Sequence, residues 1–295
     1  MESKENGLHV VAVRYEGIRR MAEASDPTPA YEASGAYEAF GPSTRAEPSY
    51  EDPGYYVDPP VALGLLDREI GNAVAEGRRE GRPVLVVGGH CTVLPGVLGG
   101  LQQAHGAASR IGLVWFDAHG DFNTPRTSIS GMLGGMPVAV AAGLALPEWR
   151  EGAGMEAPIP TDRIVLVDVR NLDPGERRLI EATDTTIAAA APGREGSDLG
   201  RAVSELAKRC DAIYLHVDSD VLDHRYVPNH PTAEPRGPSL TQVSDAIGRV
   251  FETGKVAAFG LVAVWAHGEG GATTMQSAIS LLGRAVDAWV RCGAV

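Results

Sequence analysis

Two short apolar runs each end in side chains that can bind a metal. The first is followed by Asp117, His119 and Asp121, and the second by Asp218 and Asp220. Both runs are rich in β-branched and aromatic residues, which is typical of buried strands. Parallel strands open at their carboxyl ends onto the crevice where ligands bind. Four carboxylates and an imidazole would then share one rim, and such a density of negative charge requires cations to neutralise it. The pattern predicts a cluster of two divalent metals.

The spacing of these residues supports the same interpretation. Asp117, His119 and Asp121 lie two residues apart, and an extended backbone would direct all three to one side. The alternative is an aspartate that caps the next helix beside a hydrogen-bonded histidine. A single Asp-x-Asp pair is often a turn or a cap. Asp218 and Asp220 repeat the spacing after an independent run, however, and this repetition favours metal binding.

A third strand end offers a sixth ligand. Gly88 and Gly89 allow the backbone to turn closely, and they are followed by His90 and Cys91. Either of these two side chains could bind a metal. Taken alone, the segment is equally consistent with a small buried cysteine in a turn.

The elements that must position these residues alternate along the chain. We expect strands at 8–13, 83–87, 111–116, 163–169, 213–218 and 256–264. We expect helices at 63–81, 95–105, 174–182, 198–210, 240–252 and 274–291, and a short one from Met136. Loops are expected at 22–60, 183–197 and 227–238. The alternation is typical of an α/β fold with a mostly parallel sheet, and 295 residues are compatible with one domain spanning 1–295.

Composition excludes several classes of function. A net charge of −12 argues against binding to nucleic acid or to an anionic membrane surface. Cys91, Cys210 and Cys292 are few, odd in number and far apart, so no disulfide framework is expected. The N-terminus lacks the layout of a signal peptide, and no apolar stretch is long enough for a membrane span. We therefore expect a cytoplasmic protein that acts on a small molecule, and the sequence leaves homo-oligomerisation open.

The ordered motifs resemble those of the ureohydrolase superfamily, which contains the arginases and agmatinases. The matching segments are 117–125 (DAHGDFNTP), 130–137 (SGMLGGMP) and 218–223 (DSDVLD). The resemblance extends from about Pro83 to the C-terminus. It implies a three-layer α/β/α sandwich around a mostly parallel sheet of about eight strands, with a binuclear manganese site.

The resemblance also implies a role for each metal-binding residue. Asp117 and Asp218 would bridge the two Mn²⁺ ions. The remaining ligands would be His119 and Asp220 on one ion, and Asp121 and Cys91 on the other. Asp121 would also accept a proton during the reaction.

Several positions depart from the usual motifs. Cys91 stands where the superfamily usually has a histidine ligand, in Gly-Gly-Asp-His-Ser. A thiolate is a softer ligand than imidazole, so metals other than manganese are also compatible. The same replacement resembles the cysteine-ligand subgroup typified by the Nω-hydroxyarginine hydrolase of D-cycloserine biosynthesis. The proton-shuttle histidine of arginases falls on Gly134, and their guanidinium-binding glutamate falls on Ala263.

Three further residues match positions that hold the amino-acid end of the substrate in arginases. Asn123 and Ser130 match the residues that hold the α-carboxylate, and Asp173 matches one that contacts the α-amino group. The alternatives are ordinary turn chemistry for the first two residues and a helix N-terminus for Asp173.

The expected chemistry is hydrolysis of a guanidino group. Two metals about 3.5–4 Å apart lower the pKa of a shared water, which would attack the guanidino carbon and release an amine and urea or a substituted urea. Without an imidazole at Gly134, proton delivery to a strongly basic amine is less well supported. This favours Nω-hydroxy-L-arginine or another modified guanidine over arginine. The alternatives are a plain arginase or agmatinase, and a non-catalytic member that binds metal or a guanidino ligand. A deacetylase-type zinc hydrolase is disfavoured because the chain has no His-His pair.

Other polar residues near the motifs have open roles. His216 lies inside the second strand, where we expect a core histidine in preference to one that supports the ligands. Asn229 and His230 lie in a proline-rich loop that either lines the substrate entrance or covers the surface. Trp265 begins a segment that also contains a histidine and a glutamate, and it follows the last expected strand.

Overall fold

The computed structural model describes residues 7–51 and 56–294, and within them nine strands form one sheet. Every pairing in this sheet is parallel. The order across the sheet is β4 (Thr44–Ala46), β1 (His9–Val13), β5 (Val84–Gly88), β11 (Val256–Val262), β10 (Ala212–Asp218), β6 (Ile111–Phe116), β7 (Ile164–Val167), β8 (Thr186–Ala189) and β9 (Ser197–Asp198). The predicted fold class is confirmed. The sheet exceeds the eight strands expected because both of its edges carry a very short strand.

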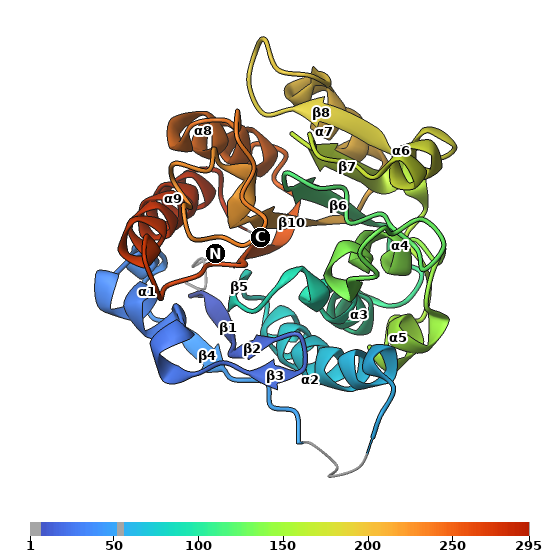
Figure 1. Cartoon of the computed structure of the whole chain (residues 1–295). Coiled ribbons are helices and arrows are strands. Elements are labelled where there is room, and N and C mark those ends of the chain that lie inside the picture. Colours follow the sequence, from blue (N-terminus) through green and yellow to red (C-terminus); the bar gives the residue numbers. More distant parts are fainter. Residues whose placement is uncertain (1–6, 52–55, 295) are drawn as a thin grey trace.

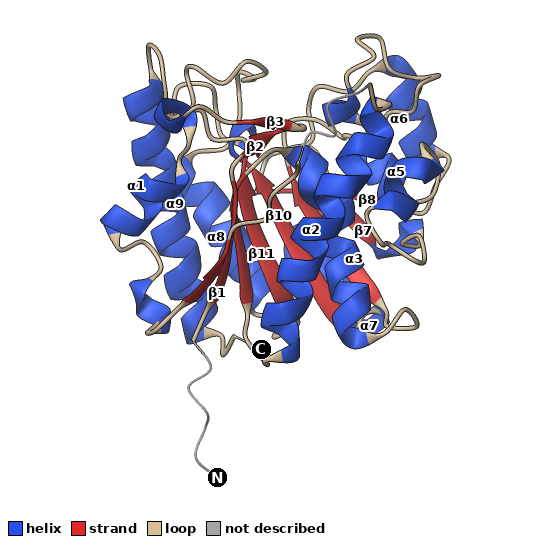
Figure 2. Cartoon of the chain, turned by 90° about the horizontal axis from the view of Figure 1, so that it is seen from below, coloured by secondary structure: helices blue, strands red, loops and turns tan. Residues whose placement is uncertain are grey.

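Helices cover both faces of the sheet, as Figure 1 shows, with α8 and α9 on one side and α2 and α3 on the other. The helices are α1 (Thr28–Ser34), α2 (Pro59–Arg79), α3 (Leu94–His105), α4 (Pro137–Ala141), α5 (Pro147–Gly152), α6 (Pro174–Glu181), α7 (Leu199–Arg209), α8 (Leu240–Phe251) and α9 (Gly271–Arg291). Figure 2 shows the strands running between these two helical layers. The arrangement is the expected three-layer α/β/α sandwich.

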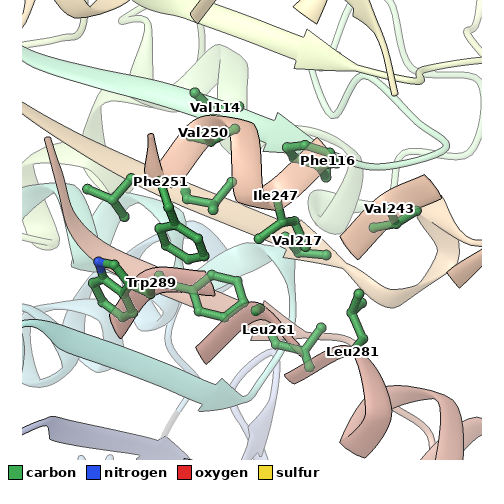
Figure 3. Close-up of a cluster of buried hydrophobic side chains, with 14 of the residues drawn as sticks. Val114, Phe116, Val217, Val243, Ile247, Val250, Phe251, Leu261, Leu281 and Trp289 are labelled. Atoms are coloured by element: carbon green, nitrogen blue, oxygen red, sulfur yellow. The ribbon is translucent and has the colours of Figure 1, made fainter. Parts of the chain in front are cut away.

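Alternate residues of each strand pack against opposite helical layers. In β1, Val10 belongs to the core on the side of α8 and α9, whereas Val11 belongs to the core on the side of α2 and α3. Figure 3 shows the first of these cores, in which Phe251 stacks on Trp289 with ring centroids 5.2 Å apart. A parallel sheet buried on both faces explains why its strands read as continuous apolar runs in the sequence.

Two segments expected as loops contain regular structure. The predicted loop at 22–60, of which 52–55 lie outside the described residues, contains α1, β4 and the 3₁₀ turns Glu23–Ser25 and Glu38–Phe40. The predicted loop at 183–197 contains β8. The proline and glycine that suggested a loop instead begin and end α1: a proline lies in its first turn, and Gly35 ends it at φ 68°. A short hairpin of β2 (Tyr15–Glu16) and β3 (Arg19–Arg20) was also not predicted.

The sheet order brings three strand ends together. β10 pairs with β6 on one side and with β11 on the other, and β11 pairs with β5. Because all of these strands are parallel, their carboxyl ends lie at one edge of the sheet. Cys91, Cys210 and Cys292 are unpaired thiols in the structure. No helix in the described part of the chain is long and apolar enough to span a membrane.

Candidate metal centre

The side chains that follow β6 converge through a turn. Asp117 comes directly after the strand, and the chain then bends instead of remaining extended. Asp121 lies in the left-handed region at φ 46°, which few residues other than glycine adopt. The expectation that an extended backbone aligns the three ligands is therefore wrong. The turn nevertheless brings Asp117, His119 and Asp121 to the wall of one cavity.

His119 joins the two aspartate motifs. Its Nδ1 lies 3.2 Å from Asp117 Oδ1 and 3.2 Å from Asp220 Oδ2. The backbone N–H of His119 also donates to Asp117 Oδ1 at 2.7 Å, and the N–H of Ala118 donates to Asp220 Oδ1 at 3.2 Å. The loop after β6 is thus fixed against the end of β10.

Cys91 completes the cluster from the third strand end. Its Sγ lies 2.9 Å from Asp218 Oδ2 and 3.8 Å from Asp117 Oδ2. The side chain is only 3% exposed, and it starts the 3₁₀ turn Cys91–Val93 directly before α3. A buried thiol that faces two carboxylates is placed as a metal ligand would be.

Among the described residues, three groups have ligand atoms within 4.8 Å of one another. These groups are Cys91 with Asp117 and Asp218, Asp117 with His119 and Asp220, and Asp218 with Asp220 and His230. Asp117, Asp218 and Asp220 each belong to two groups, so the three groups form one connected cluster. Asp121 belongs to none of them but lines the same cavity, and His90 also lines the cavity without joining a group.

The electrostatics of the cluster favour bound cations. Burial, reinforced by the neighbouring carboxylates, raises the pKa of Asp117 well above its usual value; burial likewise raises that of Asp121, although the nearby His119 lowers it. Burial lowers the pKa of His119, but its hydrogen bonds to Asp117 and Asp220 raise it to about 12. Without metal, the cluster therefore retains protons that it would lose in water. A thiol, an imidazole and four carboxylates form a donor set that divalent cations can neutralise.

His230 is a member of the cluster that the sequence did not identify. It is 6% exposed, and its Nε2 lies 3.4 Å from Asp218 Oδ1. Its Nδ1 accepts a hydrogen bond from the N–H of Thr232, whose hydroxyl donates to Asp220 Oδ2 at 2.9 Å. The proline-rich loop therefore packs His230 against the two aspartates, while Thr232 of the same loop lines the cavity.

Arg170 and Glu234 support the cluster from the outside. Arg170, partly buried, donates to the backbone carbonyls of Asp220 at 2.9 Å and Glu234 at 3.3 Å. The Glu234 side chain accepts from Asn171 and lies 3.8 Å from His119 Nε2. These contacts tie the loop after β7 to the loop after β10. They depend on side chains without a periodic pattern, so they could not be predicted from the sequence.

The residues expected to bind an amino-acid head group line the same cavity, which measures about 740 Å³ including its open mouth. Asp173 caps α6, and its Oδ2 accepts from Asn123 Nδ2 at 3.3 Å and from the N–H of Ile129 at 3.2 Å. Ser130 is exposed at the mouth of the cavity. Both the helix-cap interpretation and a cavity position therefore hold for Asp173. Glu176, which was not predicted, is buried beneath it and accepts from the N–H of Phe122.

Two other polar residues discussed above, His216 and Asn229, have different surroundings. His216 is fully buried and stacks on Trp115 with centroids 3.7 Å apart, so it is a core histidine as expected. Asn229 donates to the backbone carbonyls of Trp265 and His267, both at 2.7 Å, and so fixes the segment after β11.

Comparison with known proteins identifies the family. The sequence matches the arginase family model over residues 32–286. The chain belongs to the arginase family. This arginase-family protein is 31% identical to the arginase of Neurospora crassa over 230 residues, which cover 75% of this chain and 64% of that one. It is 32% identical to the arginase of Bacillus caldovelox over 173 residues, or 57% of this chain and 56% of that one. These two matches thus span less than two thirds of each relative.

Solved structures of family members share the fold. The arginase of Bacillus caldovelox superposes with a TM-score of 0.79 at 24% identity, covering 95% of this chain and 98% of that one. The arginase of Entamoeba histolytica in complex with L-ornithine gives 0.81 at 21% identity, with the same coverage. A formimidoylglutamase from Bacillus subtilis gives 0.70 at 14% identity, covering 96% and 87%. The binuclear manganese centre of the family agrees with the clustered ligands described above.

Proposed function

We propose that this protein is a binuclear metal-dependent amidinohydrolase that cleaves a guanidino compound to an amine and urea or a substituted urea. One observation carries the proposal. Buried carboxylates, an imidazole and a thiol converge from three strand ends on the wall of one cavity. Such a cluster is unstable without cations, and membership of the arginase family supports a pair of them.

The ligands that we propose are Cys91, Asp117, His119, Asp121, Asp218 and Asp220. Bound there, two Mn²⁺ ions would supply Lewis acidity and lower the pKa of water at neutral pH. Other divalent metals also suit the site, because Cys91 brings a softer donor than the usual histidine.

The residues of the chain then position and protonate the reactants. Asp121 Oδ1 faces Gly135, where an added Cβ would come within 4.0 Å of it. A carboxylate at this place is suited to accept a proton from the attacking water and pass it to the leaving nitrogen. The backbone N–H groups of Val138 and Ala139 donate to the Asp121 carbonyl and hold the turn that presents its side chain.

Another part of the cavity wall would bind the amino-acid end of the substrate. Asn123, Ser130 and Asp173 lie there with donors and acceptors of complementary kinds. An α-ammonium group could donate to the Asp173 carboxylate, which already accepts hydrogen bonds from Asn123 and Ile129. These contacts favour an α-amino acid over a guanidine without this head group.

The leading substrate is Nω-hydroxy-L-arginine. The chain has no imidazole at Gly134 and no carboxylate at Ala263, a buried residue at the end of β11 with φ 55°. Losing one charge-assisted contact costs about 1.5–3 kcal/mol, or roughly ten- to a hundredfold in affinity. A hydroxylated guanidine is less basic than arginine, so it depends less on these two groups. Cys91 favours the same substrate, because a cysteine at this ligand position resembles the motif of the Nω-hydroxyarginine hydrolase.

A comparison of four substrates tests this proposal. Release of urea or hydroxyurea would be measured with saturating manganese for L-arginine, Nω-hydroxy-L-arginine, agmatine and 4-guanidinobutyrate. We expect the highest kcat/KM for Nω-hydroxy-L-arginine and a poor value for arginine. If arginine proves the best of the four, the interpretation of Gly134 and Ala263 is wrong. If none is hydrolysed, the protein is a non-catalytic member of the family.

A further inference from the structure

His90 is a polar side chain on the cavity wall that no step above uses. It precedes Cys91 at the end of β5 and lines the same cavity as the metal ligands. Its ring packs edge-on against Trp265, with centroids 5.7 Å apart and planes at 76°. Neither ring nitrogen has a hydrogen-bond partner among residues 7–51 and 56–294. The ring is thus held by packing while its polar atoms are free to meet a ligand.

Gly134 lies directly opposite this ring. A Cβ built on Gly134 would be 3.8 Å from His90 Nδ1 and 3.9 Å from His90 Cε1, and it would meet no other atom within 4 Å. These are ordinary van der Waals distances, and the backbone of Gly134 is not left-handed. A side chain at Gly134 and the imidazole of His90 would therefore point into the same part of the cavity. The neighbouring Gly135 faces Asp121, so this part adjoins the proposed ligands.

We propose that His90 is a specificity-determining residue that hydrogen-bonds the guanidino end of the substrate from the wall opposite Gly134. The inference rests on the proposed amidinohydrolase function. An imidazole offers a donor or an acceptor at each ring nitrogen, which suits a guanidino or N-hydroxyguanidino group better than an apolar wall would. His90, which follows β5, thus places a polar ring beside the space that the 3₁₀ turn Leu133–Gly135 leaves open.

The first test is His90→Ala, with His105→Ala as the matched control. His105 is an exposed histidine at the far end of α3. We expect His90→Ala to lower kcat/KM for Nω-hydroxy-L-arginine roughly ten- to a hundredfold, the loss of about one hydrogen bond to a polar or charged group. Inhibition by L-ornithine, which lacks the guanidino group, should remain unchanged, as should the manganese content. The His105→Ala protein should match the wild type in all three measurements.

The second test moves the imidazole to the opposite wall. In the double variant His90→Ala/Gly134→His the new side chain has the space that the first substitution vacates. We expect it to recover at least tenfold of the lost kcat/KM, with the manganese content of the wild type.

Three results would overturn the inference: wild-type kcat/KM in His90→Ala, an equal weakening of ornithine inhibition, or a double variant that recovers nothing. A wild-type protein that hydrolyses no guanidino compound refutes the proposed function itself. Hydrolysis by the wild type that is insensitive to His90 refutes only the present inference.

Discussion

Replacing Cys91 by serine should remove one of the two metals selectively. The thiol is 3% exposed and faces Asp218 Oδ2 at 2.9 Å and Asp117 Oδ2 at 3.8 Å. A serine hydroxyl on a shorter bond reaches less far and remains protonated at neutral pH. His119 and Asp220 lie on the other side of the cluster, so the ion that they bind should be little affected.

The size of the effect follows from the role of the sulfur. Removing a residue that merely supports a metal ligand typically weakens binding ten- to a hundredfold. Removing a ligand itself should cost at least the upper value, which corresponds to about 2.7 kcal/mol. At micromolar manganese this loss would empty one site and leave the other filled. Cys91→His should again hold two ions, because it restores a nitrogen donor at the same place.

The assay is metal content after equilibrium dialysis, combined with calorimetric titration. Cys210→Ser provides the matched control, since Cys210 is equally buried but lies beside Gly112 near the start of β6. We expect two manganese ions in the wild type and in Cys210→Ser, and one in Cys91→Ser. Unchanged stoichiometry and affinity in Cys91→Ser would mean that the thiol only packs beside the site.

Three further predictions concern the same cluster. Burial raises the pKa of Asp117 and Asp121, and His119 keeps its proton to about pH 12. Burial lowers the pKa of His90 and His216, which opposes this effect below about pH 6.5. Above that pH the metal-free folded state binds more protons than the unfolded chain, and its melting temperature should fall between about pH 7 and pH 9. Calorimetry should show a flatter profile with manganese, and a flat profile without metal would contradict the pKa directions. Asp121→Asn should lower kcat by roughly a hundred- to ten-thousandfold at saturating manganese. A decrease in kcat of less than tenfold in a stopped assay would exclude proton transfer by this residue. Arg170→Ala should destabilise the fold by about 1.5–3 kcal/mol in urea unfolding, because it leaves the carbonyls of two loops unpaired; an unchanged midpoint would show that water replaces the guanidinium.

The regular part of the fold could be predicted because its signals are local. The buried runs of β5, β6 and β10 are continuous and apolar, and parallel pairing then places their polar ends at one edge of the sheet. The strand β8, next to the edge of the sheet, was missed for the converse reason. Three of its four residues are only partly buried, so it carries little hydrophobic signal.

The residues around the cavity divide in a similar way. Asp117, His119 and Asp121 were found from their spacing, although the turn that brings them together differs from the extended backbone expected. The sequence could not show that His230 and Glu234 lie beside the cluster, because only tertiary packing brings their proline-rich loop back to it. A histidine four residues before a glutamate is too common a pattern to indicate a role by itself.

The central claim is that two metals and this cavity together hydrolyse a guanidino group. The most direct test is a titration of the metal-free protein with manganese while the release of urea or hydroxyurea from Nω-hydroxy-L-arginine is followed. We predict no activity in the metal-free protein, and activity that rises with manganese and saturates at two ions per chain. Saturation at one ion, or no release at any manganese concentration, would contradict the account.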